Sequence, residues 1–475
     1  MTVEDIDLTA TLAQARELLA KEAGLSPTFK SVVELLLVII TLLSNRLGLN
    51  SRNSSKPPSS DSNRQQKSNK SSQSNNKPGG QAGRTGAHLG VCDDPDETVF
   101  IPLNREDLPR GKLKAETPEI RQVFDIRIQR WVTEYQAEVF IDENGKRYVA
   151  PFPDTVPQKV QYGSTLKAHA VYLSQFQLLP YLRIQNYFLD QVGIPISVGS
   201  LFNFNRQAYE RLEVFDETVK QKLIDSALLH VDETGINVNG RRIWLHCAAS
   251  DLWTYYYPHQ KRGKEAMDDM GILPTFTGTA CHDHWKPYYR YTQCQHALCN
   301  AHHLRELERA YEHDGQQWAY DMQLLLVAMN RFVVDAGGEL DEETRQSYLD
   351  QYHKVLNDAE NECPEPKPDP NKKHRGRIKR SKARNLLERL KHFADDVLRF
   401  TTDKTIPFTN NQGENDIRMT KVQQKISGCF RSMEGAAIFC RNRSYLSSCR
   451  KQGKSATEAL KAVFEGDPMA FLTKT

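Results

Sequence analysis

The feature that most constrains this fold is a run of short apolar segments, separated by turn residues, between positions 228 and 307. Such segments are typical of buried strands. Three of them in succession predict an antiparallel meander, and a helix precedes the fourth. The expected elements are strands over 228–231, 242–249, 253–258 and 275–281, a helix over 261–270, and a short fifth strand that runs into a helix within 296–307. This order predicts an α/β fold with an RNase H-like core, a mixed five-stranded sheet with helices in which the first and fourth strands are neighbours.

Two acidic residues end expected strands, and a third lies at an expected helix start. Asp232 follows the first strand and Asp283 the fourth, and strand ends are where α/β folds place functional groups. Glu414 lies in a segment, 410–418, that is typical of a helix start, and Arg418 projects from the same face four residues later. Each acid alone would be interpreted as a cap or turn residue. All three in the order strand, strand, helix indicate a phosphoryl-transfer site with two metal ions.

The three carboxylates suit phosphodiester cleavage, because that reaction needs a nucleophilic oxygen and a stabilised leaving oxygen. Two divalent ions about 4 Å apart serve both oxygens. Mg²⁺ and Mn²⁺ prefer carboxylate oxygens to Cys or His ligands. We therefore expect Asp232, Asp283 and Glu414 to be the catalytic residues and to hold two Mg²⁺ or Mn²⁺ ions.

The cysteines indicate neither disulfides nor zinc. All nine are scattered without regular pairing, which is typical of a protein in a reducing compartment. Cys299 and His302 have a Cys-x-x-His spacing that can hold zinc, with Cys294 and His303 nearby. A structural thiol and polar histidines are the favoured interpretation, so zinc is not expected here.

Composition bounds the compartment and the partners. A chain of 475 residues allows several domains and a sizeable core. The net charge of +3 is nearly balanced, so affinity for nucleic acid must come from local clusters. The most apolar run, 35–43, is too short to span a bilayer, and no signal peptide is recognised. We expect a soluble cytoplasmic protein with no membrane partner.

Two basic clusters are candidates for contact with DNA. One lies within residues 372–384, which contain no acid, and it is interpreted either as a solvated face or as a track for the DNA backbone. The other follows Glu414 on the expected helix and beyond it. The candidate DNA-binding residues are Arg375, Arg377, Lys379, Arg380, Arg418, Lys421, Lys425 and Arg431.

The chain divides by composition and pattern into seven regions. The N-terminal helices carry a short heptad pattern that indicates either self-association or packing on the protein's own core. A Ser-, Asn- and Lys-rich segment follows, interpreted as a disordered linker or as a basic arm that orders on DNA. The expected regions are 1–50, N-terminal helices; 51–90, the linker or arm; 91–160, a small β module; 161–226, a helical region, either a bundle or a helix-turn-helix-like DNA-binding unit; 227–305, the first part of the core; 306–400, a helical insertion with the basic run; and 401–475, the second part of the core with C-terminal helices.

Several of these strings together resemble the IS66 family of bacterial DDE transposases. The resemblance covers nearly the whole chain, and its first and third strings are specific in combination. The strings are NSSKPPSSD (53–61) with the Gly-rich stretch after it, HVDET (230–234), HDHW (282–285), NNQGENDIR (410–418) and KISGCFRS (425–432).

This resemblance implies a function and a set of partners. Enzymes of the family nick the ends of an insertion sequence to free 3′-hydroxyls and use these to attack target DNA. By motif match, Asp232, Asp283 and Glu414 take the metal-ligand roles. The implied partners are the terminal inverted repeats of the element, target DNA, further copies of the chain on DNA, and accessory proteins of the same element. Binding to DNA would associate the protein with the nucleoid.

The chain departs from the family pattern at two places, and two other functions compete. The family's Cys-x-x-Cys zinc module is reduced to Cys92, which puts metal-stabilised recognition of the element ends in doubt. Asn415 follows Glu414 where the family has Arg, which changes a phosphate contact rather than the metal site. The rivals are an RNase H-like nuclease or resolvase that cuts without joining, and a catalytically silent, transposase-derived DNA-binding protein. A strand-transfer assay separates the first rival, and absence of metal-dependent nicking would favour the second.

Overall fold

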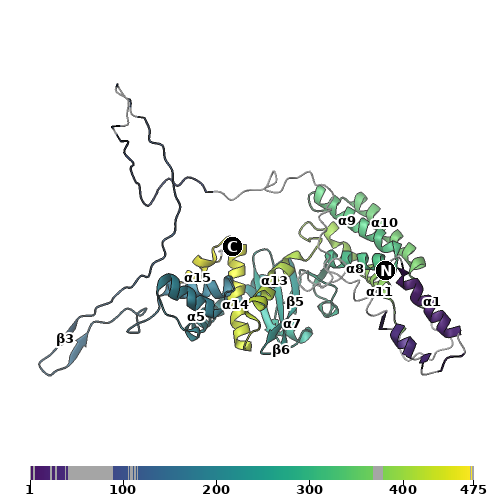
Figure 1. Ribbon diagram of the computed structural model, residues 1–475, viewed down its shortest axis with the longest axis horizontal. Coiled ribbons are helices and arrows are strands. Elements are labelled where there is room, and N and C mark those ends of the chain that lie inside the picture. The colour runs from purple at the N-terminus through teal and green to yellow at the C-terminus, as the bar shows by residue number, and fades with distance from the viewer. Residues whose placement is uncertain are drawn as a thin grey trace.

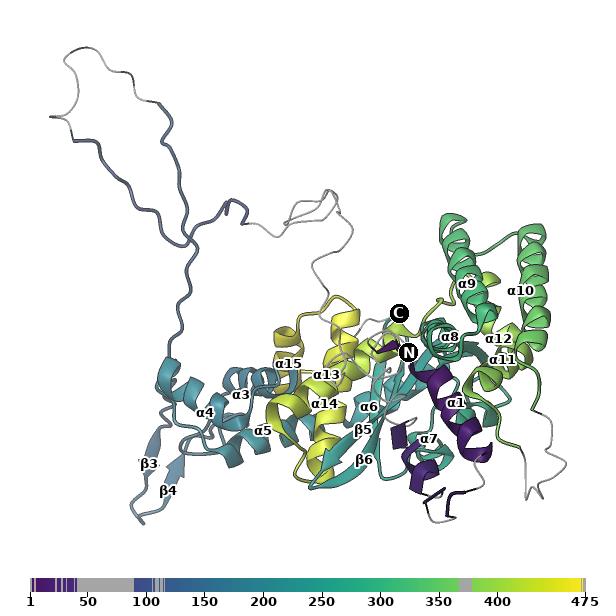
Figure 2. The ribbon, with the colours of Figure 1, turned by 45° about the vertical axis from the view of Figure 1, so that its right-hand side comes forward.

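A computed structural model describes most of the chain and places a β-sheet between two groups of helices (Figures 1 and 2). One group comes from residues 164–226 and the C-terminal part, and the other lies between the last strand and residue 401. The described residues are 89–366 and 378–472, except 105, 107–110, 112, 113, 115 and 471, together with 2–3, 6–21, 24–26, 29–30, 32–37 and 39–40.

The central sheet has five strands in the order β7-β6-β5-β8-β9. The first three strands along the chain form an antiparallel meander, and β8 and β9 are parallel to β5. The strands are β5 (Leu228–Val238), β6 (Arg241–Ala249), β7 (Thr254–His259), β8 (Thr279–His282) and β9 (Gln295–Leu298). The mixed five-stranded sheet is confirmed, and so is the pairing of the first strand with the fourth.

The first strand is longer than the sequence analysis predicted. β5 does not end at Asp232 but continues to Val238, and every residue from His230 to Val238 is paired with β6. The reason is a two-residue turn at Asn239 and Gly240, both with positive φ (47° and 80°), which returns the chain directly into β6. Asp232 therefore lies inside a regular strand, where it is paired with Cys247 of β6.

Helices cover both faces of the sheet. On one face, α13 (Asn411–Ser427) and α14 (Met433–Lys451) pack against β5, β6 and β7 through Leu245, Ile417 and Phe439. On the other face lies α7 (Lys264–Met270), whose buried methionines contact the same core as Val231. The helix expected over 261–270 is thus confirmed. Successive residues of β5 face opposite layers, so Asp232 points toward the α13 side and Glu233 away from it.

A helical region on one side of the sheet shares its core with the C-terminal helices. Buried apolar residues of α3, α5 and α6 pack with those of α14 and α15, so the two ends of this half fold together. Two π-helical turns, Tyr172–Phe176 and Phe188–Val192, end α3 and α4. The helices are α3 (Ser164–Val171), α4 (Tyr181–Tyr187), α5 (Val198–Arg211), α6 (Glu213–Ile224) and α15 (Ala456–Glu465).

A second helical group, called the insertion below, lies between β9 and α13 and shares a hydrophobic core with Cys281 of β8 and with Ala297 and Leu298 of β9. Long amphipathic helices bury Trp318, Leu326 and Tyr352 in that core. Its helices are α8 (Asn300–Asp314), α9 (Gln317–Asp335), α10 (Glu342–Glu362), α11 (Lys382–His392) and α12 (Ala394–Leu398). Because α8 follows β9 directly, the insertion is joined to the sheet at the strand that neighbours β8.

The β module expected before residue 160 is only partly formed. A hairpin of β3 (Val139–Ile141) and β4 (Arg147–Val149) is present within it. Residues 99–101 and 123–126 are not strands, and their apolar side chains are exposed, Val123 at 92%. Alternation predicts a strand only if a second layer covers the apolar side, and no described residue supplies one.

Further expectations concern the cysteines, membrane-spanning helices and the N-terminal region. None of the nine cysteines forms a disulfide. Within the described part of the chain, no helix has the length and apolarity needed to cross a membrane. In the N-terminal region, α1 (Leu8–Lys21) is a helix. Residues 51–88, Arg375 and Arg377 lie outside the described residues.

Candidate active site

Pairing between β5 and β8 determines where two of the three predicted acids lie. The parallel register aligns His230 with Cys281, and two residues further along each chain come Asp232 and Asp283. Asp283 is the first residue after β8, so both carboxylates lie where these two strands diverge. The negative charges of Asp283 and Glu414 both act on Asp232, so the three predicted residues are near enough to interact, although their oxygens do not all lie within 4.8 Å of one another. We refer to them as the acid trio.

Glu414 reaches this neighbourhood because Asn410 anchors the start of α13 to β5. The buried Asn410 side chain donates from Nδ2 to the carbonyl of Val231 (2.9 Å). Its Oδ1 accepts from Nδ1 of His230 (2.8 Å). Gly413 completes the fit, because a Cβ there would lie only 3.1 Å from the Asn410 amide. Glu414 stands in the first turn, so this anchor directs it toward Asp232.

The electrostatics of the trio are those of a site that lacks positive charge. Burial raises the pKa of Asp232 well above its usual value, and the carboxylates of Glu233, Asp283 and Glu414 add to the rise. Backbone N–H groups provide some compensation: Glu233 donates to Asp232 (2.8 Å) and Trp285 to Asp283 (3.0 Å). Among the residues that the structure describes, no lysine or arginine forms an ion pair with the trio. Clustered carboxylates without counter-charge are the donor set that hard divalent cations require.

A fourth acid, Glu233, lies next to the trio and was not predicted as a functional residue. Its side chain is 2% exposed and is held by Arg262 Nη2 (2.6 Å) and by the Tyr288 hydroxyl (2.5 Å). Burial first, and then the charge of Asp283, raises its pKa. Glu233 therefore brings a paired cation and a phenol close to Asp283. Side chains alternate between the two faces of a strand, so the sequence alone could have placed Glu233 on the face of β5 opposite to Asp232.

Arg262 is itself fixed by aromatic rings. Its guanidinium carbon lies 4.2 Å from the ring centroid of Trp285 and 4.8 Å from that of Trp244. Cation–π contacts of this kind orient an arginine without neutralising it. Trp285 is also the residue whose N–H supports Asp283, so the contacts of Arg262 connect Glu233 to the loop that carries Asp283.

Behind Asp283, a buried pair of histidines supports the backbone. His282 donates from Nδ1 to the carbonyl of Asp283, which leaves its Nε2 to accept from Nδ1 of His296 (3.0 Å). Burial lowers the pKa of His282 to about 3, so the ring is neutral at physiological pH. This neutral network fixes the peptide at the end of β8 and adds no charge to the site.

On its other side, Glu414 has two softer donors for neighbours. Cys299 Sγ and His302 Nδ1 each lie 3.8 Å from Glu414 Oε1. These three donor atoms all lie within 4.8 Å of one another. The carboxylate of Glu414 thus lies between the two aspartates and a Cys–His pair.

Six of the eight predicted DNA-binding residues lie in the described part of the chain, and they divide into three groups. Lys379, Arg418, Lys425 and Arg431 are exposed. Lys421 is exposed as well, but its ammonium group donates to the Gly235 carbonyl (2.5 Å).

Arg380 forms the third group and differs from the expectation of a free basic run. It pairs with Glu365 (2.6 Å) and Glu388 (3.6 Å) inside the insertion and is 19% exposed. The basic run contains no acid, but Glu365 and Glu388, which pair with Arg380, lie outside the run.

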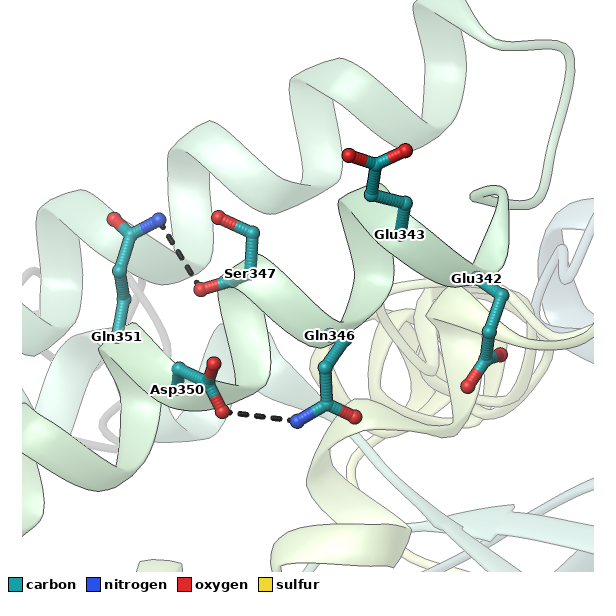
Figure 3. Close-up of a pocket in the computed structure, with 6 residues that line it drawn as sticks. All are labelled: Glu342, Glu343, Gln346, Ser347, Asp350 and Gln351. Carbon is teal, nitrogen blue, oxygen red and sulfur yellow. Dashed lines mark hydrogen bonds between the residues drawn. The ribbon is translucent and has the colours of Figure 1, made fainter.

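A shallow polar hollow on the insertion is a different feature from the acid trio. Figure 3 shows side chains that project from a single helix, α10, and two hydrogen bonds along it. Its lining residues are Glu342, Glu343, Gln346, Ser347, Asp350 and Gln351. None belongs to the strands or helix starts that carry the predicted acids, so the trio remains the candidate site.

Comparison with known families identifies two matching regions. A family model described as transposase IS66 family matches residues 159–438, more than half of the chain, including the sheet, the insertion and α13. A model for a family of unknown function, DUF6444, matches residues 5–90. No curated protein matches the chain.

Proposed function

This chain belongs to the IS66 transposase family, and from that premise we propose that it cuts DNA strands at the ends of its element and joins the freed 3′-hydroxyls to target DNA. Asp232, Asp283 and Glu414 are the proposed catalytic residues. The observation that carries the proposal is the approach of three carboxylates, from β5, the end of β8 and the start of α13, with no lysine or arginine ion pair to any of them among the described residues.

The sheet supports an RNase H-like reading of the core. Three antiparallel strands, a helix and two parallel strands, with the first and fourth strands adjacent, follow the order expected from the sequence. On this interpretation the insertion separates Glu414 from the rest of the core in sequence. The hydrogen bond from Asn410 to Val231 holds the start of α13, and with it Glu414, against β5. The remaining regions then serve the DNA: the helices of 161–226, the basic arm within 51–90, and residues 1–50 for assembly of copies on DNA.

By its donor chemistry the trio suits Mg²⁺ or Mn²⁺ ions, two of them in the proposed mechanism. When bound, such ions stabilise the attacking and leaving oxygens of the phosphodiester. The protein's part is to supply carboxylate oxygens. Burial, and then the neighbouring negative charges, raise the pKa of Asp232, so cation binding would relieve both costs. The N–H groups of Glu233 and Trp285 orient the two aspartates.

The exposed cations on and after α13 are the proposed contacts to the phosphate backbone. Arg418 and Lys425 lie on the helix that begins at the site, and Arg431 follows it. Exposed basic residues beside an acid cluster counter the repulsion between DNA and carboxylates. Lys379 lies at the edge of the described part of the insertion and is assigned the same role. Arg380 is not, because its charge is already paired.

The proposal is tested with DNA that carries the terminal repeats of the element and a separate target. Asp232→Ala, Asp283→Ala and Glu414→Ala are each expected to abolish Mg²⁺-dependent cleavage and strand joining and to leave DNA binding largely intact. Glu434→Ala is the matched control, since Glu434 is an exposed acid in the first turn of the neighbouring helix α14. Catalysis that survives in any trio variant removes that residue from the site.

The same assay separates the rival functions. Cleaved ends that are never joined to target DNA would indicate a nuclease or resolvase. Binding to DNA without nicking in Mg²⁺ or Mn²⁺ would indicate a catalytically silent DNA-binding protein.

A further inference from the structure

Two helix starts that are far apart along the chain meet beside Glu414. Cys299 precedes α8 as its N-cap and His302 lies in the first turn, while Glu414 lies in the first turn of α13. Backbone hydrogen bonds hold the two starts together: Asn300 donates to the Phe408 carbonyl (3.0 Å), and Asn410 donates to Cys299 Sγ (3.1 Å). The meeting is therefore a fixed part of the fold.

The spacing of the donor atoms is close to that of a tetrahedral metal site. In such a site with thiolate, imidazole and carboxylate ligands, neighbouring donor atoms lie about 3.3–3.6 Å apart. Here the sulfur and the imidazole nitrogen each lie 3.8 Å from the carboxylate oxygen, and all three lie within 4.8 Å of one another. Small side-chain rotations would bring them onto one ion.

One buried polar atom at this point lacks a hydrogen-bond partner. Nδ1 of His302 is buried and has no hydrogen-bond partner, which is costly for an imidazole nitrogen. The next histidine behaves differently: His303 donates from Nδ1 to the Asn300 side chain (2.9 Å). The sulfur of Cys299 accepts the Asn410 N–H (3.1 Å) at the start of a helix, while burial raises the pKa of the thiol to about 11, so a bound cation would have to displace its proton.

We propose that Cys299, His302 and Glu414 bind one thiophilic divalent cation of the zinc class, with the fourth position open to water or a ligand. Soft thiolate and imidazole donors select such ions over Mg²⁺. The sequence favoured a structural thiol, with only the nearby Cys294 and His303 as candidate further donors, whereas the third donor here, Glu414, comes from a distant helix. The ion would hold Oε1 of Glu414 and leave its other oxygen to the trio. The site shares Glu414 with the proposed function but does not depend on it.

Cobalt is the probe that reads this site directly. The purified full-length protein, stripped by a chelator, is expected to bind one Co²⁺ with a thiolate-to-cobalt charge-transfer band and the visible bands of tetrahedral coordination, and Zn²⁺ should displace it. Cys299→Ser should abolish the charge-transfer band. His302→Gln should weaken binding by at least about 100-fold, since even changes outside the ligand set cost 10–100-fold. Loss of the thiol proton predicts release of about one proton per ion.

Two variants serve as controls for adventitious binding. Cys429→Ser removes an exposed thiol, and His313→Gln removes a histidine from the far end of α8. Both should keep the full spectrum and affinity. If Cys299→Ser fails to fold, His302→Gln still tests the site, because His302 is partly exposed (24%) and its loss leaves the core intact.

The outcomes distinguish this site from the proposed chemistry. Asp232→Ala and Asp283→Ala should keep the cobalt spectrum although they lose cleavage, and Glu414→Gln should lose both. A cobalt spectrum without any DNA cleavage by the wild-type protein would support the zinc-class site and overturn the proposed function. Absence of a stoichiometric thiolate–cobalt band in the folded wild-type protein would overturn the zinc-class site alone.

Discussion

Two groups of acidic residues in this molecule lie in opposite electrostatic settings. In the insertion, the Arg384 guanidinium, 6% exposed, pairs with Glu360 (2.5 Å), Glu365 (3.1 Å) and Glu388. Lys391 adds a second cation to Glu360 at 2.9 Å. At the sheet, the described part of the chain gives the acid trio backbone N–H groups, the Cys299 thiol and the His302 imidazole, but no lysine or arginine ion pair. One set of charges is balanced within the fold, and the other is not.

One carboxyl in each group has a shifted pKa, and the two shifts have opposite directions. Hydrogen bonds from Arg384 and Lys391 lower the pKa of Glu360 to about 2. Burial, reinforced by neighbouring carboxylates, raises the pKa of Asp232. An acid whose pKa is lowered already has the cation that it needs and stabilises the fold. An acid whose pKa is raised gains from a cation supplied from outside, which is what a metal site provides.

Neutralising one member of the trio should have the largest effect on function. Asp232→Asn is expected to reduce strand cleavage by about 10⁴-fold or more, a loss of about 5 kcal/mol in transition-state stabilisation. Its effect on stability should have the opposite sign. Because the folded-state pKa is raised, ionised Asp232 costs stability, and the cost grows as pH rises above the unfolded pKa. The metal-free variant should therefore unfold at a higher temperature than wild type at pH 7–8.

Thermal unfolding with and without Mg²⁺ checks the same variant. Divalent cation should raise the midpoint of the wild-type protein by about 2–4 °C for each kcal/mol of binding. The rise should be much smaller for Asp232→Asn. A variant that is less stable than wild type without metal would show that Asp232 is a structural acid like Glu360.

Breaking the balanced group should produce the reverse pattern. Arg384→Met removes a buried guanidinium and leaves Glu360, Glu365 and Glu388 with only Lys391 and Arg380 as partners, which should cost about 1–3 kcal/mol. We expect a large drop in the unfolding temperature of the insertion, followed by calorimetry, and little change in cleavage rate at temperatures where the variant is folded. Lys379→Met, an exposed cation beside the same helix, is the control and should be nearly neutral. A loss of cleavage without loss of stability would contradict the structural role of Arg384.

Asn410 tests whether the fold or the local chain positions Glu414. Asn410→Ala deletes two buried hydrogen bonds and leaves the Val231 carbonyl and the His230 ring unsatisfied, a cost of about 2–3 kcal/mol. The cleavage rate should fall while DNA binding is retained, because the start of α13, which carries Glu414, loses its hydrogen bonds to β5. Asn411→Ala, an exposed neighbour, should leave the rate unchanged. Equal rates for the two variants would mean that Glu414 is held by other contacts.

The elements that sequence could predict are those with a local signal. Strand periodicity indicated the order of the sheet and the acids near the ends of its buried segments. The alternation of Thr234, Ile236 and Val238 also indicated that β5 continues. Using that signal required recognising that the turn at Gly240 leads directly from β5 into β6. In contrast, the Asn410 anchor and the partners of Arg384 join segments far apart along the chain. No local pattern encodes such contacts, because folding alone brings their donors and acceptors together.

Acid titration gives the smallest and most specific test of the comparison. The pKa of Glu360 is lowered, so its ion pairs contribute stability above the unfolded pKa, near 4.5, and lose it as pH falls toward 2. Wild type should therefore be more stable than Glu360→Gln at pH 6, by about 1–2 kcal/mol after screening by solvent, since Glu360 is about one-third exposed. Thermal unfolding at a series of pH values should show the two proteins converge below pH 3. Parallel curves across that range would mean that the Arg384 group gains nothing from the charge of Glu360, and the contrast with the trio would then rest on burial alone.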